Sequence, residues 1–319
     1  MHRLVGGFAA LALMLTSAAC NSAQPSNVTE SGGTTKVTVG VIPIVDVAPI
    51  YLGKQKGFFA SRGIDLVLES GQGGAAIVPG VVSGQFQFGF SNVTSLMLAQ
   101  SNGVPIKAVV NGVNSTGKAG EDFGGIVVKG DSPIQSAKDL AGKTVAVNTL
   151  KNIGDTTVRE SVRKAGGDPG AVKFVEIAFA QMPAALAASQ VDAAWVVEPS
   201  LSAVKAQGGR AIAWNYVDTA PNLTVAVYFT SAKLRQENPA LVTKFTEAMI
   251  ESLKYADTHP DEVRAILGSY TQISEQVRAS LTLPKWPVEI NRGSLETLLR
   301  LGKADGIFTK DPDLGALLP

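Results

Sequence analysis

Short apolar runs alternate with helical segments along most of the chain, starting at Lys36. The runs are rich in valine and isoleucine and predict strands at residues 37–42, 64–68, 86–90, 106–110, 125–128, 144–147, 172–177, 193–197 and 225–229. Helical segments separate most of them, at residues 49–55, 75–83, 94–100, 136–141, 157–165 and 183–189. Strand–helix–strand units this short predict parallel pairing through crossover helices, so the predicted fold class is α/β.

Local residues mark several of the helix boundaries. Pro49 stands where a helix can begin, because the N–H that proline lacks is not needed at the first helical position. Gly57 follows the end of the same predicted helix. Thr157 and Glu160 have the spacing of a capping box, which predicts a helix that opens there and runs to about Ala165.

Longer helical patterns follow the last predicted strand, at residues 239–259, 260–267, 275–280 and 294–304. Two groups of strands followed by a helical tail predict a bilobal protein with one sheet in each lobe. We expect the chain to cross between the lobes twice, near Gly124–Gly125 and near Asn222–Leu223. The predicted first lobe then contains residues 36–124 and 225–319, and the second contains residues 125–224.

The N-terminus has the order of a secretory signal: a basic start at Met1–Arg3, an apolar run over 4–15, and small residues up to Ala19. The apolar run is too short to span a bilayer, which needs about 20 residues. Cys20 follows directly and resembles the lipidated cysteine of a bacterial lipobox, although Ser17 stands where that pattern prefers leucine. A plain cleaved signal is the alternative. Both interpretations place the mature protein outside the cytoplasm, and the lipobox predicts a membrane anchor at residue 20.

Composition narrows the possible functions. Residues 21–35 are polar and rich in Ser, Thr and Gly, which predicts a flexible linker after the signal at 1–20. Because Cys20 is the sole cysteine, disulfides, iron–sulfur clusters and cysteine nucleophiles are excluded from the folded part. The net charge of +1 argues against a nucleic-acid partner. The sequence also offers no metal-ligand cluster.

Several blocks of the mature chain match one known family in order. They are Val39-Gly-Val-Ile-Pro43, Ala48-Pro-Ile-Tyr-Leu-Gly53, Lys56-Gly-Phe-Phe59, Ser83-Gly-Gln-Phe86, Gly89-Phe-Ser-Asn92, Ser136-Ala-Lys-Asp-Leu-Ala-Gly-Lys-Thr-Val145, Val191-Asp-Ala-Ala-Trp-Val-Val-Glu-Pro199 and Leu283-Pro-Lys-Trp286. The chain thereby resembles the nitrate, sulfonate, taurine and thiamine-pyrimidine-precursor binding proteins of ABC importers. The resemblance implies a type 2 periplasmic-binding-protein fold, with two lobes that close on a small solute.

The same resemblance implies partners and a mode of action. A binding protein of this family delivers its solute to an ABC permease and ATPase, without a cofactor and without chemistry, and we expect a monomer. One branch of the superfamily is instead an enzyme that makes a thiamine pyrimidine with its own histidine, a lysine-bound pyridoxal phosphate and a cysteine-rich segment. This chain has only His2 and His259 and lacks that segment, so we expect no enzyme. A surface sensor or adhesion module that reuses the fold is a third possibility.

In open parallel sheets, ligands bind beyond the carboxyl ends of the strands. Asp46 follows the first strand and is either a solute ligand or a cap of the next helix. Gly74 precedes a helix, where glycine allows close backbone approach to a ligand or simply makes a tight turn. Asn92 and Thr94 follow the strand at 86–90, and both suit either capping or solute contact.

The second predicted lobe adds further candidates. The loop at 148–157 contains Asn152, Asp155 and Thr156, where the family implies hydroxyl and N–H groups for an oxyanion. Asp155 would oppose an anion if it faced the solute, and it could cap the helix instead. Glu198 ends the strand at 193–197, with Trp195 on the same strand face. A glutamate here suits a solute with N–H donors, such as an aminopyrimidine or a taurine ammonium, better than nitrate, unless it pairs with a Lys or Arg of the lobe.

Overall fold

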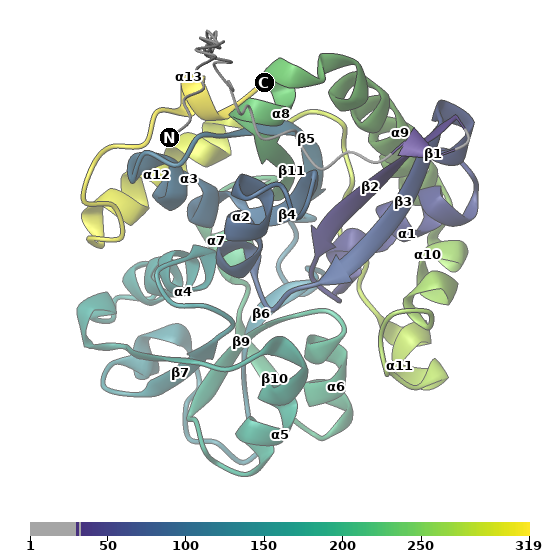
Figure 1. Ribbon diagram of the computed structural model, residues 1–319. Coiled ribbons are helices and arrows are strands. Elements are labelled where there is room, and N and C mark those ends of the chain that lie inside the picture. The colour runs from purple at the N-terminus through teal and green to yellow at the C-terminus, as the bar shows by residue number, and fades with distance from the viewer. Residues whose placement is uncertain (1–29, 32) are drawn as a thin grey trace, which may run out of the picture.

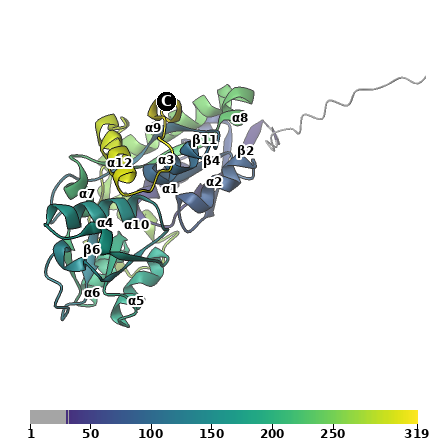
Figure 2. The ribbon, with the colours of Figure 1, turned by 90° about the vertical axis from the view of Figure 1, so that its left-hand side faces the viewer.

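The computed structural model describes residues 30–31 and 33–319, so Cys20 and the predicted signal lie outside the described residues. The chain forms two lobes, each built on its own sheet, and Figures 1 and 2 show them stacked one above the other. We call the upper one lobe 1 and the lower one lobe 2. The predicted α/β fold with two sheet-bearing lobes and a helical C-terminal region is confirmed.

Lobe 1 contains a six-stranded sheet in the order β1-β2-β4-β11-β5, with β3 on β2. Its strands are β1 (Glu30–Ser31), β2 (Thr34–Val41), β3 (Ile64–Ser70), β4 (Phe88–Asn92), β5 (Ile106–Asn114) and β11 (Thr224–Ser231). Strand β2 begins inside the segment that the sequence predicts as linker, where it pairs with β1. Lobe 2 contains a five-stranded sheet in the order β10-β6-β9-β7-β8. Its strands are β6 (Gly124–Val128), β7 (Thr144–Val147), β8 (Lys173–Glu176), β9 (Ala193–Val197) and β10 (Arg210–Ala213).

Both sheets are mixed, which corrects the prediction of purely parallel pairing. Strand β2 is parallel to β3 and β4, and β7 is parallel to β8 and β9. Strand β11 is antiparallel to β4 and β5, and β6 is antiparallel to β9 and β10. The two antiparallel strands are those that enter their sheet from the other lobe. A crossover helix makes two strands parallel only when both belong to the same sheet. The strand–helix–strand pattern therefore does not predict the directions of β6 and β11.

Helices cover both sheets. In lobe 1, α1 packs on α9 and α10, while α2 and α3 pack together on β4. The helices of the chain are α1 (Ala48–Gln55), α2 (Gly74–Val82), α3 (Val93–Ser101), α4 (Ile153–Lys164), α5 (Met182–Ala187), α6 (Ser200–Ala206), α7 (Asn215–Thr219), α8 (Ala232–Glu237), α9 (Pro239–Thr258), α10 (Pro260–Leu267), α11 (Glu275–Ser280), α12 (Arg292–Ala304) and α13 (Leu314–Leu317). Across the described part of the chain, none of these helices combines the length and the apolar content that a bilayer span requires.

One predicted helix start is wrong. Helix α4 begins at Ile153, where the Asn152 side chain accepts a hydrogen bond from the Gly154 N–H at 2.8 Å. Thr157 lies inside the helix, and its hydroxyl donates to the Ile153 carbonyl oxygen at 2.7 Å. Asn152 caps the helix about one turn before Thr157, so the capping-box spacing of Thr157 and Glu160 does not mark the start of a helix.

The C-terminal region belongs to lobe 1 and also contacts lobe 2. Besides the crossings between β5 and β6 and between β10 and β11, the segment after α10 contacts lobe 2, because α11 packs on α6. Helix α12 contacts both α3 of lobe 1 and α4 of lobe 2. Figure 2 shows α12 at the junction of the two lobes, above α4.

Candidate functional site

The lobes meet where β2 of lobe 1 and β9 of lobe 2 end. Strand β2 leads into a short 3-10 helix, η1 (Val45–Val47), and β9 leads into Glu198. The Val45 N–H donates to the Glu198 carbonyl oxygen at 3.1 Å, so the two strand ends are in direct contact. Asp46 and Glu198, two predicted site residues, are therefore brought to the same junction.

Asp46 is a buried acid without a charge partner. Its side chain is 2 % exposed, and its Oδ1 has no hydrogen-bond partner among the described residues. Burial raises the pKa of Asp46 to about 8, against the effect of a hydrogen bond from its own N–H, and the nearby Asp122 carboxylate raises it further. The backbone is fixed, because the Trp286 indole N–H donates to the Asp46 carbonyl oxygen at 3.0 Å. The carboxyl group is thus held in place and is protonated near neutral pH.

The Asp46 carboxylate acts on three tyrosines, of which Tyr216 and Tyr228 are buried and Tyr270 is partly buried. Burial raises the pKa values of Tyr216, Tyr228 and Tyr270 well above 10, and the charge of Asp46 contributes to each shift. The Tyr270 ring stacks on Tyr51 with centroids 3.9 Å apart, and its hydroxyl donates to a lobe 1 backbone carbonyl. The Tyr228 hydroxyl has no partner within the described chain. These aromatic groups come from both lobes, since Tyr216 lies on α7 and Tyr228 on β11.

Trp195 adds a buried N–H donor from lobe 2. Its side chain is 2 % exposed, and its Nε1 makes no well-aligned hydrogen bond among the described residues. The indole N–H lies close enough to the Tyr216 hydroxyl to oppose the rise in the pKa of that tyrosine. The ring lies edge-on to Phe179 and Tyr216, at centroid distances of 5.1 and 6.1 Å. A Cβ at Gly154 would lie 2.5 Å from the Trp195 ring, so glycine lets the start of α4 press on it. Buried polar atoms without partners are rare and call for an explanation such as a ligand or water.

Glu198 differs from Asp46 in every one of its contacts. Its carboxylate accepts hydrogen bonds from the Ser202 hydroxyl at 2.8 Å, the Ser202 N–H at 2.9 Å and the Thr282 N–H at 3.2 Å. Burial raises its pKa, and the bonds from Ser202 and Thr282 oppose the rise. Both oxygens are therefore occupied by the protein, and the side chain ties α6 to the C-terminal segment.

The predicted loops of lobe 1 serve the helices that follow them. Asn92 caps α3, accepting from the Ser95 N–H at 2.9 Å. Thr94 is fully buried, and its hydroxyl has no partner in the described structure. A Cβ at Gly74 would lie 1.8 Å from the Ser91 hydroxyl oxygen, so this glycine is required by the packing of α2 on β4. Of these residues, only Thr94 keeps a free polar atom.

The predicted loop of lobe 2 forms the start of α4. Asn152 is its cap, and the Thr156 hydroxyl donates to the Asn152 carbonyl oxygen at 3.0 Å. Asp155 accepts from the Lys151 N–H at 2.9 Å with Oδ2, while Oδ1 has no partner among the described residues. Burial raises the pKa of Asp155 to about 6, opposed by the Lys151 hydrogen bond and the Arg159 charge. Asn152, Asp155 and Thr156 thus lie together at the start of α4. Asp155 and Asp46 are not among the leading causes of each other's pKa shifts.

Two further contacts hold the lobes together away from Asp46, and sequence reasoning missed both. Asn148 of lobe 2 donates from Nδ2 to the Gln72 carbonyl oxygen of lobe 1 at 3.3 Å. Arg163 on α4 pairs with Asp305 just after α12 at 2.6 Å, and with Glu160 on its own helix. Contacts between residues more than 70 positions apart leave no local signal in one sequence.

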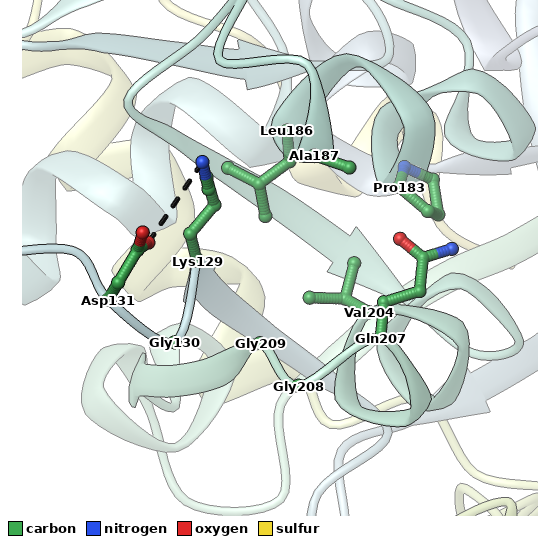
Figure 3. A pocket seen from close by; sticks show the side chains of 10 residues that line it. All are labelled: Lys129, Gly130, Asp131, Pro183, Leu186, Ala187, Val204, Gln207, Gly208 and Gly209. Carbon is green, nitrogen blue, oxygen red and sulfur yellow. Dashed lines mark ion pairs between the residues drawn. The ribbon is translucent and has the colours of Figure 1, made fainter.

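A separate pocket of about 380 Å³ lies at the far end of lobe 2, beyond the last residue of β6. Figure 3 shows Lys129 and Asp131 on one side, where they form an ion pair at 4.0 Å, and the apolar side chains of Leu186 and Val204 beside them. Its charged groups already pair with each other, and the predicted site residues are not among those that line it. The described residues also contain no group of three or more His, Cys, Asp or Glu that could hold a metal ion.

Comparison with known proteins fits this arrangement. Residues 44–263 match the family model described as NMT1/THI5 like. The chain belongs to this family. Its resemblance to the binding proteins of the nitrate, sulfonate and taurine type is confirmed.

Curated relatives are distant. The chain is 25 % identical over 230 residues to the riboflavin-binding protein RibY of Chloroflexus aurantiacus, covering 71 % of this chain and 63 % of RibY. It is 22 % identical over 290 residues to the formylaminopyrimidine-binding protein of Halalkalibacterium halodurans, covering 90 % and 82 %. It is 27 % identical over 191 residues to the taurine-binding periplasmic protein of Escherichia coli, covering 59 % and 56 %. The chain thus spans less than two thirds of the length of the first and third relatives.

Solved structures share the fold. The alkanesulfonate-binding protein SsuA of Xanthomonas axonopodis, bound to MOPS, matches with a TM-score of 0.74 and 16 % identity over 89 % of this chain and 98 % of SsuA. The periplasmic nitrate-binding protein NrtA of Synechocystis matches with a TM-score of 0.72 and 16 % identity, over 86 % and 83 %. At these identities the likeness concerns the fold alone.

Proposed function

We propose that the chain is the extracytoplasmic solute-binding subunit of an ABC importer. It captures a small organic solute where lobe 1 (36–124 and 225–319) meets lobe 2 (125–224), and delivers it to a permease driven by an ATPase. The observation that carries the proposal is a group of buried polar atoms on both lobes without hydrogen-bond partners among the described residues, which includes Asp46 Oδ1, Thr94 Oγ1, Asp155 Oδ1 and Tyr228 OH. A solute that bonds to several of them would satisfy groups that the described protein leaves unsatisfied.

The charges around Asp46 favour one solute class over another. The titratable groups that act on the pKa values of Asp46, Tyr216, Tyr228 and Tyr270 are carboxyl groups and phenols, and the phenols are neutral at pH 7. Arg, Lys and His are not among the leading causes of these shifts. A buried anion needs a cation or several donors to offset its lost hydration. A solute with N–H donors, such as an aminopyrimidine or another N-heterocycle, suits this site better than nitrate, taurine or an alkyl sulfonate.

The names of the relatives support both classes. Two of the curated relatives are named for heterocycles, riboflavin and formylaminopyrimidine, and one for taurine. The sequence and the fold therefore leave the solute open, and the acids around Asp46 favour the heterocycle.

A thermal-shift screen tests the capture of solute. The purified protein is melted with nitrate, taurine, alkyl sulfonates, aminopyrimidines, riboflavin and aromatic carboxylates. A ligand present at about 100 times its Kd stabilises a protein by about 2.7 kcal/mol, which is a shift of several degrees. We expect a shift with a heterocycle. A shift with nitrate or a sulfonate alone would overturn the solute class, and a flat panel would count against solute capture.

Lipid anchoring at Cys20 is part of the proposal and concerns a residue outside the described structure. Cys20→Ser should release the protein from the membrane into the soluble fraction, measured by fractionation and immunoblotting. The control is Ser17→Ala, which should keep the protein at the membrane. Unchanged membrane retention of Cys20→Ser would remove the lipoprotein assignment.

Binding without chemistry is favoured over the synthase branch of the superfamily. His259, the described histidine, stacks on Tyr255 at 3.8 Å and shares a hydrogen bond with the Tyr255 carbonyl oxygen at 2.8 Å. It is not among the groups that act on Asp46. The absorbance spectrum of the purified protein tests this choice, because a bound pyridoxal-type cofactor absorbs in the near ultraviolet and its presence would favour the enzyme.

A further inference from the structure

Asp46 is a buried acid with a vacant oxygen where β2 and β9 end, and burial raises its pKa further than that of Asp155, to about 8 against about 6. Its Oδ1 has no partner in the described chain, while its backbone is fixed by Trp286 on one side and by the Val45–Glu198 contact on the other. The titratable groups that face it come from every element around the junction. They are Asp122 between β5 and β6, Tyr216 on α7, Tyr228 on β11 and Tyr270 after α10, while Glu198 is joined by a backbone hydrogen bond to Val45, the residue before Asp46.

The two neighbouring acids do not stabilise a negative charge on Asp46, and the hydrogen bond that lowers its pKa comes from its own N–H. Asp122 already binds its own segment, accepting from the Ser115 hydroxyl at 2.7 Å and the Thr116 N–H at 2.9 Å. Glu198 is likewise bound by Ser202 and Thr282. Burial therefore holds the pKa of Asp46 at about 8, and the empty site contains a neutral carboxyl group at pH 7. A neutral carboxyl offers one O–H donor and one acceptor oxygen side by side.

We propose that Asp46 is a specificity residue that shares its proton with a basic ring nitrogen of the solute. This inference rests on the proposed function and concerns the same site. On binding, the carboxyl O–H bond breaks and an N–H bond forms on the ring nitrogen, while the electron pair stays on the carboxylate oxygen. An amino group next to that nitrogen donates to the second oxygen. Tyr228 OH, which has no partner in the described structure, remains for the rest of the solute.

The shared proton fixes how affinity changes with pH. Between the pKa of the free ring nitrogen and that of Asp46, the empty protein brings the proton, so binding exchanges none with the solvent. Above pH 8 the empty Asp46 is ionised, and each binding event takes up one proton, so affinity falls about tenfold per pH unit. Below the pKa of the ring nitrogen the free solute is already a cation, and binding releases a proton.

Calorimetry of the full protein with 4-amino-2-methylpyrimidine tests the proposal. Titrations at pH 7 and pH 9, each in two buffers of different ionisation enthalpy, report the protons exchanged. We expect almost none at pH 7 and close to one taken up at pH 9. Riboflavin at the same pH values is the second probe, chosen because its ring system offers no comparably basic nitrogen.

Two variants sharpen the measurement. Asp46→Asn should abolish the uptake at pH 9, whereas Asp311→Asn, which removes an acid of an exposed pair with Lys303, should retain it. Wild-type binding at pH 9 without proton uptake overturns the proposal and leaves solute capture intact, and so does binding of riboflavin but not the pyrimidine. Failure of the whole solute panel to bind counts against the proposed function itself. The wild-type titration decides the matter even if Asp46→Asn does not fold.

Discussion

Two buried acids lie at the junction of the lobes, and they are treated differently by the protein. Glu198, at the end of β9, has both oxygens occupied by Ser202 and Thr282. Asp46, after β2, has a vacant oxygen and neighbours that are acids or phenols. Burial is almost the same, at 0 % and 2 % exposure. What separates a structural acid from a candidate binding acid is therefore the supply of donors, and exposure does not distinguish them.

We expect the largest loss of stability when Glu198, the acid whose oxygens are both hydrogen-bonded, is replaced. Glu198→Ala leaves the Ser202 and Thr282 N–H groups buried without an acceptor, so we expect a loss of roughly 3 kcal/mol in the free energy of unfolding. Chemical denaturation of the empty protein measures it. Glu198→Gln, which keeps one acceptor oxygen, should lose less. An empty Glu198→Ala protein as stable as wild type, with weaker solute binding, would reverse the assignment and make Glu198 a solute ligand.

Asp46→Asn should raise the free energy of unfolding at high pH, whereas Glu198→Ala lowers it. An acid whose pKa is raised from 3.8 to about 8 by folding costs stability as pH rises through that window, to a limit of roughly 6 kcal/mol above pH 8. A buried amide N–H without a partner costs about 2 kcal/mol, so the variant should gain about 4 kcal/mol at pH 9. At pH 4 it should be no more stable than wild type. Melting curves from pH 4 to 9 check this, and parallel curves would refute an ionising, buried Asp46.

The Arg163 bridge allows the junction to be loosened without touching either acid. Arg163→Met removes the ion pair with Asp305 across the lobes, and we expect the closed form to lose about 1 kcal/mol, with solute dissociation about fivefold faster. Stopped-flow release of a bound heterocycle measures the rate. Lys303→Met, which removes an exposed pair with Asp311, is the control and should change nothing. Equal rates in both variants would show that the bridge does not hold the lobes together.

The smallest effect compares two tyrosines. Tyr228→Phe removes a buried hydroxyl without a partner in the described structure, so the empty protein should keep or slightly gain stability, by under about 1 kcal/mol. Tyr270→Phe removes a hydroxyl that donates to the Ile44 carbonyl at 3.1 Å, and should lose about 1 kcal/mol. Differential scanning calorimetry distinguishes them. Solute affinity should fall in Tyr228→Phe, and an unchanged affinity would take Tyr228 out of the proposed site.

Much of the fold follows from local pattern. The strands Thr144–Val147 and Ala193–Val197 and the helices Pro260–Leu267 and Glu275–Ser280 have the predicted boundaries. Strand β10 was missed, because its sequence Arg-Ala-Ile-Ala is short and has one strong strand former. The directions of β6 and β11 also escaped prediction, since they depend on how the chain returns from the other lobe.

The site was less predictable than the fold. Asp46 could be named from its place after a strand, and so could Glu198, but their donors could not. Ser202 lies one helical turn after Glu198, whereas Thr282 comes from a distant segment. The tyrosines around Asp46 were missed because buried aromatic residues in a sequence are indistinguishable from core. Only tertiary structure shows which polar atoms are left without partners.

The bond between Thr282 and Glu198 also limits the path along which the lobes can part. Lys285, three residues after Thr282, exchanges two backbone hydrogen bonds with Asn114 at the end of β5. Three residues reach about 10 Å when fully extended. The short segment from Thr282 to Lys285 therefore links Glu198 of lobe 2 to Asn114 of lobe 1. While both sets of hydrogen bonds remain formed, the lobes cannot separate far at this edge. If the lobes open about this edge, the Asn148–Gln72 hydrogen bond and the Arg163–Asp305 ion pair are among the contacts between the lobes that have to break.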